Sequence, residues 1–162
     1  MIAQTSSQTA VVTLPNDDQI LITREFAAPK HLVYQAYTTP ELVKRWWSAG
    51  LGETTLAEID LYVGGHWRYV MVTHGGDEVG FHGEYRKIIP NERIVFTETF
   101  EGMPDGETLN TVTFSEKNGR TTLTALVQTS NKAVRDAIIN SGMEVGMQTA
   151  MDLLEQVAVS IG

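Results

Sequence analysis

Cysteine is missing from this sequence, and its absence excludes disulfide bonds, thiolate zinc sites and cysteine nucleophiles together. The chain also lacks any run of eighteen consecutive apolar residues, so no segment is expected to span a membrane. Residues 1–19 have no basic start followed by an apolar stretch and do not resemble a signal peptide. Together these absences favour a cytoplasmic protein, because disulfides are rare where thiols stay reduced.

Positive charge is scarce. Twelve lysines and arginines stand against twenty aspartates and glutamates, and the net charge of −8 repels phosphate backbones, so nucleic acid is not an expected partner. Phosphate loops, dinucleotide fingerprints and G-x-S-x-G elbows are absent. The four histidines, His31, His66, His74 and His82, include no pair at the three- or four-residue spacing of a helical metal site. We therefore expect neither a metal ion nor another cofactor.

The chain of 162 residues, 42% of them apolar, is long enough for one domain with its own hydrophobic core. Residues 1–18 are rich in polar side chains, which predicts a flexible N-terminal arm or an extra edge strand. Residues 19–162 are expected to form the domain itself. Because an exposed edge strand needs cover, which an arm from a second copy would supply, a homodimer is one possible assembly.

The first part of the domain is expected to contain a strand and two short helices. Gln19–Ala27 alternates apolar and polar residues at period two, as a strand does. Lys30–Tyr37 has the spacing of a helix. A second helix is expected to begin after Thr39, which suits the N-cap, with Pro40 at the first helical position, and to stop near Gly50.

From Thr54 onward the period of two returns and predicts six more strands. The segments are separated by turn residues such as Asn118-Gly119, and connections this short allow only antiparallel pairing. Added to the first strand, they make a seven-stranded antiparallel sheet. The six segments are Thr54–Leu61, His66–Thr73, Gly80–Ile89, Arg93–Glu101, Thr108–Glu116 and Thr121–Thr129.

The last predicted element is a long helix, Lys132–Val159, with Asn131 as its cap. Gly142 and Gly146 interrupt it, and each costs about 1 kcal/mol relative to alanine in a helix interior. The helix is therefore expected to begin irregularly and to become regular only after Gly142. The order of a strand, two helices, six strands and a long helix predicts an α+β domain whose curved sheet wraps around the C-terminal helix.

Several short segments occur in the order found in one known family. They are Phe26-Ala27-Ala28-Pro29, Pro40-Glu41-Leu42 with Trp46-Trp47, Glu58-Ile59-Asp60-Leu61, Gly64-Gly65-His66-Trp67-Arg68, Gly83-Glu84-Tyr85, Pro90-Asn91-Glu92-Arg93-Ile94-Val95-Phe96-Thr97 and Gly142-Met143-Glu144-Val145-Gly146. Together, across Ile20–Val159, they resemble the homologues of the activator of heat-shock-protein 90 ATPase, within the START-like (SRPBCC, birch-pollen-allergen-like) superfamily. The resemblance implies a helix-grip fold with a deep hydrophobic cavity between the sheet and the C-terminal helix.

The resemblance does not imply one activity, because this superfamily contains lipid and sterol carriers, plant hormone receptors, aromatic-polyketide cyclases and co-chaperone domains. Two features depart from the family pattern. Met147 stands where these homologues often have tryptophan, which predicts a softer and roomier cavity floor. The co-chaperone proper also carries an additional N-terminal domain, which the short arm of residues 1–18 is not expected to supply.

Candidate ligand-binding residues come from a methionine stripe and from aromatic strand faces. Met143, Met147 and Met151 recur every four residues on one helix face, either as core packing or as an adaptable cavity wall. Gly142 and Gly146 beside them are interpreted as making room between helix and sheet. Aromatic residues sharing strand faces are expected to form the remaining wall. The full predicted set is Trp46, Trp67, Tyr69, Met71, Phe81, Tyr85, Met143, Met147 and Met151, with Trp47 beside Trp46 near the mouth.

The leading hypothesis is a protein that binds a small hydrophobic or amphipathic molecule in this cavity, rather than an enzyme. The alternative is an enzyme of the cyclase or hydrolase kind, in which Tyr85, Glu98 or His66 transfers a proton on a bound substrate. A buried carboxylate or histidine without a structural partner would favour the enzyme. A co-chaperone-like partner of heat-shock protein 90 is the third hypothesis.

A second polar group lies on the predicted strands that flank Gly64-Gly65. Glu58 and Asp60 share a face of one strand, and His66 and Arg68 share a face of the next. If these side chains meet, they are able to do acid–base work. Cross-strand ion pairs on a solvated face are the commoner explanation of such a pattern.

Overall fold

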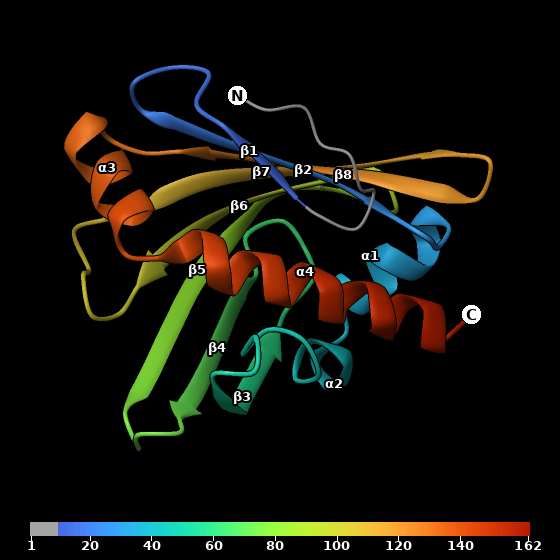
Figure 1. Cartoon of the computed structure of the whole chain (residues 1–162), viewed down its shortest axis with the longest axis horizontal. Helices are drawn as coiled ribbons and strands as arrows, with labels where there is room; N and C mark the ends of the chain where they lie inside the picture. Colours follow the sequence, from blue (N-terminus) through green and yellow to red (C-terminus); the bar gives the residue numbers. More distant parts are fainter. Residues whose placement is uncertain (1–9) are drawn as a thin grey trace.

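In the computed structural model, which describes residues 10–162, eight antiparallel strands form one curved sheet with four helices on its inner side (Figure 1). The strands are β1 Val11–Thr13, β2 Gln19–Phe26, β3 Gly52–Ile59, β4 His66–Thr73, β5 Glu78–Ile89, β6 Arg93–Phe100, β7 Thr108–Lys117 and β8 Arg120–Gln128. The helices are α1 Lys30–Thr38, α2 Pro40–Val43, α3 Lys132–Asn140 and α4 Met143–Ser160.

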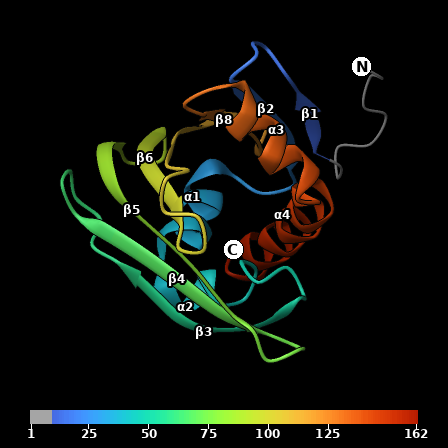
Figure 2. The same cartoon turned by 90° about the vertical axis from the view of Figure 1, so that its left-hand side faces the viewer.

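The strand order in the sheet is β1-β2-β8-β7-β6-β5-β4-β3. Strands β3 to β8 form the predicted meander, and β2 returns to pair with β8. Figure 2 shows the sheet bending around α1, with β3 and β4 on one side, β1, β2 and β8 on the other, and α4 along the open side. The predicted α+β class, antiparallel curved sheet and C-terminal helix are confirmed.

The predicted number of seven strands is wrong, because Val11–Thr13 adds an eighth strand at the edge. It pairs antiparallel with β2, with Val11 opposite Thr23. Gln148 on α4 also holds the residue before this strand: its side-chain amide donates to the carbonyl of Ala10 (2.7 Å) and its oxygen accepts from the Ala10 N–H (2.9 Å). Three residues are too few to show a period, so the sequence offered an extra edge strand only as one of two possibilities for residues 1–18. The rest of the predicted arm, residues 1–9, lies outside the described residues.

The single C-terminal helix that the sequence predicts is two helices. Asn131 caps α3 as predicted, its side chain accepting from the N–H of Val134 (2.9 Å). The chain then breaks at Gly142, which adopts a left-handed conformation (φ +83°) and forms the N-cap of α4. The regular helix after Gly142 is confirmed, but the segment before it is a helix of its own. The left-handed conformation explains the glycine, since other residues adopt it at a cost of about 1 kcal/mol.

Burial is uneven along α4. The apolar residues of α4 that are buried, Leu154, Val157 and Ala158, all lie in its second half, which packs against α1. The first half has half-buried residues on its inner face and an exposed Val145 on the outer one. The helix is therefore anchored mainly at its C-terminal end.

A buried charge cluster ties β2 to α4. The Arg24 side chain is fully buried, with Nη2 2.7 Å from Asp152 Oδ1 and Nη1 3.4 Å from Glu155 Oε2. Its guanidinium also lies over the ring of Phe26, 4.6 Å from the centroid. Glu155 accepts a second hydrogen bond from the N–H of Ala27 (2.8 Å). The Arg24–Glu155 contact therefore fixes the orientation of α4 across the sheet.

The second helix is shorter than predicted, because only Pro40–Val43 is helical and residues 44–50 form successive turns. Ala49 and Gly50 have positive φ angles of 55° and 73°, which end the helical path. The indole N–H of Trp46 donates to the carbonyl of Ala36 (3.0 Å) and so ties this segment to α1. These turns place Trp46 and Trp47 against the inner face of the sheet.

Candidate functional site

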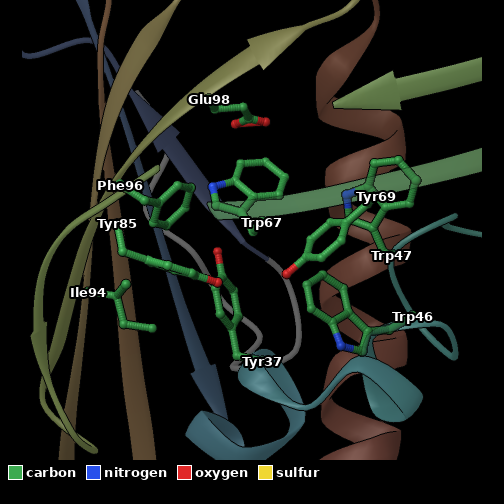
Figure 3. Close-up of a pocket in the computed structure, with 9 residues that line it drawn as sticks. All are labelled: Tyr37, Trp46, Trp47, Trp67, Tyr69, Tyr85, Ile94, Phe96 and Glu98. Atoms are coloured by element: carbon green, nitrogen blue, oxygen red, sulfur yellow. The ribbon is translucent and has the colours of Figure 1, made fainter. Parts of the chain in front are cut away.

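An aromatic cavity of about 110 Å³ lies between the first two helices and one half of the sheet (Figure 3). Its walls come from α1, from the turns after α2 and from β4, β5 and β6. No lining residue within the described part of the chain comes from α3 or α4. The lining residues are Tyr37, Trp46, Trp47, Trp67, Tyr69, Tyr85, Ile94, Phe96 and Glu98.

The aromatic rings pack against one another, so the cavity has a defined shape. Trp67 lies 4.8 Å from Tyr69 and meets Phe96 edge to face at 5.7 Å, measured between ring centroids. Trp47 meets Tyr69 edge to face at 5.4 Å. The indole N–H of Trp67 donates to the carbonyl of Thr97 (3.2 Å), which fixes the plane of that ring. All three tryptophans of the protein line this one cavity.

A glycine makes the close approach of these strands possible. Gly83 on β5 lies opposite Trp67 and directly beside β6. A Cβ at this position would overlap the carbonyl oxygen of Thr97 and lie 2.6 Å from the indole nitrogen of Trp67. Gly83 therefore allows the hydrogen bond that orients Trp67.

Three tyrosine hydroxyls give the apolar cavity a polar centre. Figure 3 shows the hydroxyls of Tyr37, Tyr69 and Tyr85 pointing toward one another from α1, β4 and β5. The hydroxyls of Tyr69 and Tyr85 lie near enough for each to influence the pKa of the other. Burial raises the pKa of all three phenols well above the usual value, because the phenolate form would lose its hydration. They are therefore neutral donors and acceptors at physiological pH.

Glu98 on β6 supplies the one acidic side chain of the cavity. It is half-buried and lines the cavity. Among residues 10–162, its carboxylate has no hydrogen-bond or ion-pair partner. Burial raises its pKa from 4.5 to about 7, because an ionised carboxylate loses hydration in an aromatic environment. At neutral pH the carboxyl group is therefore divided between its two protonation states.

The structure brings four of the predicted ligand-binding residues together: Trp46, Trp67, Tyr69 and Tyr85 line the cavity. Phe81 lies just outside the lining, edge to face with Trp47 at 5.7 Å. Met71 is buried opposite Thr54 and Val79 near the end of β4 and does not reach the cavity.

The methionine stripe is not part of this cavity. Met143 and Met147 pack with Ala10, Ile20 and other apolar residues in a second cluster between α4 and the β1–β2 edge. Met151 contacts both that cluster and the main core. The first half of α4 turns its apolar face toward β2, while the aromatic wall stands on β4 to β6. The prediction that the methionines and the aromatic residues line one shared cavity is therefore wrong, because the two sets lie in different parts of the molecule.

The two glycines predicted to make room also have other roles. Gly142 forms the break between α3 and α4 and is exposed. A Cβ at Gly146 would meet no atom within 4 Å, so this position neither contacts the sheet closely nor forms the cavity floor. Helical periodicity identified the face of α4 on which they lie, but it carried no information on which part of the sheet that face meets.

Five lining residues were absent from the predicted binding set: Tyr37, Trp47, Ile94, Phe96 and Glu98. A signal for the last three exists in the sequence. Ile94, Phe96 and Glu98 alternate on β6, so an acidic residue continues the apolar face of a strand. An acidic side chain in that position is unusual, since isolated carboxylates are rarely buried without a partner.

The second polar group predicted from the sequence lies elsewhere. Glu58, Asp60, His66 and Arg68 line an open hollow of about 520 Å³ at β3, β4 and β5, which His82 also borders. Its arginine and one histidine are paired, because Arg68 forms two hydrogen bonds with Glu101 (2.8 and 2.9 Å) and His82 Nδ1 lies 2.9 Å from the same carboxylate. These contacts, the Arg68 hydrogen bond foremost, lower the pKa of Glu101 to about 2. Of the three predicted proton-transferring residues, Tyr85 and Glu98 are in the cavity and His66 is in this hollow.

Within residues 10–162, no group of three or more histidine or acidic side chains is arranged to hold a metal ion. No helix in the same range is long and apolar enough to cross a membrane.

Comparison with known proteins places the chain among proteins of one fold. A family described as "Activator of Hsp90 ATPase homolog 1-like protein" matches residues 27–158. A crystal structure of a protein from Rhodobacter sphaeroides is 25% identical, with a TM-score of 0.86 and coverage of 94% of this chain and 99% of that one. A solution structure from Arthrobacter aurescens is 23% identical (TM-score 0.83; coverage 93% and 91%), and a crystal structure from Nitrosomonas europaea is 20% identical (TM-score 0.82; coverage 91% and 98%). Among curated proteins, none matches the chain.

Proposed function

The chain belongs to the activator of Hsp90 ATPase homolog 1-like family, and we propose that its aromatic cavity binds a small hydrophobic or amphipathic molecule. The observation that carries the proposal is the cavity itself, with eight apolar or aromatic side chains around one carboxylate. Ligand sites in proteins have this composition: mostly apolar and aromatic walls with a few convergent polar groups. The fold supports the same conclusion, since proteins resembling it include carriers of apolar molecules.

The dimensions of the cavity limit the ligand. A volume of about 110 Å³ is somewhat below the roughly 150 Å³ of an engineered cavity that admits benzene. A single ring or a branched alkyl group fits better than a sterol skeleton. Trp47 and Glu98 keep part of their surface accessible, so a longer ligand is able to leave its remainder at the open side. The three hydroxyls favour a ligand with one polar atom near the ring.

We expect single-ring compounds to change the tryptophan fluorescence of the protein, because every tryptophan lines the cavity. A titration with benzyl alcohol or toluene measures the change directly, because neither compound contains an indole. Ile94→Phe fills part of the cavity and is expected to weaken binding at least tenfold. Val95→Phe, on the opposite face of the same strand, is the matched control and should bind normally.

The proposal fails if no single-ring compound perturbs the fluorescence or raises the melting temperature of the wild-type protein. It also fails if Ile94→Phe, folded by circular dichroism, binds as tightly as Val95→Phe. The second variant distinguishes loss of the cavity from a general effect of an added ring.

One observation favours a second candidate function, proton transfer on the bound molecule. Glu98 has no structural partner among the described residues, and its raised pKa of about 7 suits a general acid or base near neutrality. A simple probe is acetophenone, whose methyl protons exchange with D2O when a base removes one of them. Exchange catalysed by the wild-type protein and lost in Glu98→Gln would support an enzyme. Exchange at the buffer rate with both proteins would contradict the enzyme, and ligand binding would remain as the proposed function.

A further inference from the structure

We propose that the cavity selects small organic cations, in which an ammonium group on a compact ring or branched alkyl group lies between the aromatic rings and the carboxylate of Glu98. This inference rests on the proposed function and names the ligand class of the same site. It follows from how charge is distributed in the cavity and from the chemistry of its walls.

The first argument is the charge balance of the lining. Glu98 is the one side chain of the lining that ionises near neutral pH, and no lysine, arginine or histidine lines the cavity beside it. Two other carboxylates of the described chain that are shielded from solvent have cationic partners: Glu155 has Arg24, and Glu101 has Arg68. Glu98 has no such partner among residues 10–162. A buried carboxylate is stabilised by a cation within reach, and here the ligand is positioned to supply it.

The second argument is the nature of the walls. In the view of Figure 3, the carboxylate of Glu98 lies above the ring of Trp67. Phe96 and Tyr69 lie to either side of that ring, and Tyr37 and Tyr85 lie below it. The faces of electron-rich rings attract cations, most strongly when water is excluded. The tyrosine hydroxyls also accept hydrogen bonds from an ammonium group. The aromatic walls and the carboxylate of Glu98 therefore both favour a cationic ligand.

Other ligand classes fit this arrangement less well. An anionic ligand would place two like charges together in a site of low polarity, which is strongly unfavourable. A neutral ligand would leave the carboxylate without an ionic partner and would favour its protonated form. The cationic ligand alone satisfies the carboxylate in its ionised form.

The inference carries a pH dependence with a definite sign. The titratable groups that face Glu98 are the phenols of Tyr37 on α1 and Tyr69 on β4, with Tyr85 on β5 behind them, and all three remain neutral across the range considered. A cation binds the ionised carboxylate, so acidification below the pKa of about 7 must weaken binding. Linkage gives a loss of about 30-fold in affinity between pH 8 and pH 5.5.

The test compares three ligands that share one skeleton: benzylamine, which is a cation throughout this range, benzyl alcohol, which is neutral, and benzoate, which is an anion. Binding is measured by tryptophan fluorescence and by isothermal titration calorimetry. At pH 8 we expect benzylamine to bind at least tenfold more tightly than benzyl alcohol, and benzoate to bind most weakly. At pH 5.5 the advantage of benzylamine should shrink by about 30-fold, while benzyl alcohol binds slightly better or equally.

Two variants localise the effect. Glu98→Gln removes the charge and should abolish both the preference for benzylamine and its pH dependence, while benzyl alcohol still binds. Glu53→Gln changes the net charge equally at an exposed position on β3 and should behave as wild type.

Each alternative outcome decides between the two proposals. If benzylamine and benzyl alcohol bind equally to the wild-type protein, the cation inference is overturned and the proposed ligand-binding function stands. The same holds if Glu98→Gln keeps the full preference for benzylamine. If none of the three ligands binds at either pH, both the inference and the proposed function for single-ring ligands fail.

Discussion

Replacement of Arg24 by methionine is expected to lower the free energy of unfolding by about 3–5 kcal/mol. The guanidinium is fully buried and holds Asp152 and Glu155 on α4 from its position on β2. Methionine keeps much of the apolar stem but leaves the carboxylate of Glu155, only 11% exposed, without its cation. The cost comes chiefly from that uncompensated buried charge rather than from the lost attraction. Urea denaturation followed by circular dichroism measures the effect.

Two companion variants separate the causes. Asp152 is 53% exposed, so Asp152→Asn should cost about 1 kcal/mol or less. The double variant Arg24→Met with Glu155→Met removes both buried charges and should recover at least half of the stability that the single variant loses, because an apolar pair is able to replace a buried ion pair. Equal instability of the single and double variants would contradict this account and assign the loss to packing alone.

The second large effect concerns the pH dependence of stability through Glu98. Its pKa rises from 4.5 to about 7 on folding, so between these values the folded protein binds more protons than the unfolded chain. Stability therefore falls as the pH rises, in the direction opposite to that of a carboxylate held by a salt bridge. From pH 4.5 to about pH 8 we expect Glu98 to reduce the free energy of unfolding by about 3 kcal/mol.

Comparison with Glu98→Gln isolates this contribution, because every other titrating group is common to both proteins. The difference in unfolding free energy, Glu98→Gln minus wild type, should grow by about 3 kcal/mol from pH 4.5 to about pH 8. Glu101 provides the contrast: its pKa is lowered to about 2, so its contribution is present above the unfolded pKa and disappears as the pH falls toward 2. A difference that does not vary with pH would show that Glu98 titrates normally in the folded protein.

The sheet was predictable from the sequence because its information is local. Alternation at period two and turn residues such as Asn118-Gly119 place strands and hairpins without knowledge of the rest of the chain. The positive φ of Asn118 (55°) and Gly119 (75°) is the geometry that these residue types favour. Val11–Thr13 shows the limit, since a three-residue strand is defined by its partner β2 and not by its own pattern.

The candidate site was only half predictable, because it depends on which elements face each other. Trp67 and Tyr69 followed from strand alternation alone. The assignment of Met143 and Met147 to the same wall required α4 to face β4, whereas α4 faces the β1–β2 edge in its first half. Glu98 was considered only as one of three candidates, because its lack of a partner is a property of the folded surroundings.

The uneven burial of α4 has a dynamic consequence. Segments with few buried contacts open by local unfolding at a free-energy cost below that of the whole molecule. The first turns after Gly142 belong to this class, whereas the turns around Leu154, Val157 and Ala158 open only when the core does. That second half of α4 packs on α1, which carries Tyr37 into the cavity. Fraying of the first turns of α4 therefore leaves α1 and the aromatic cavity undisturbed.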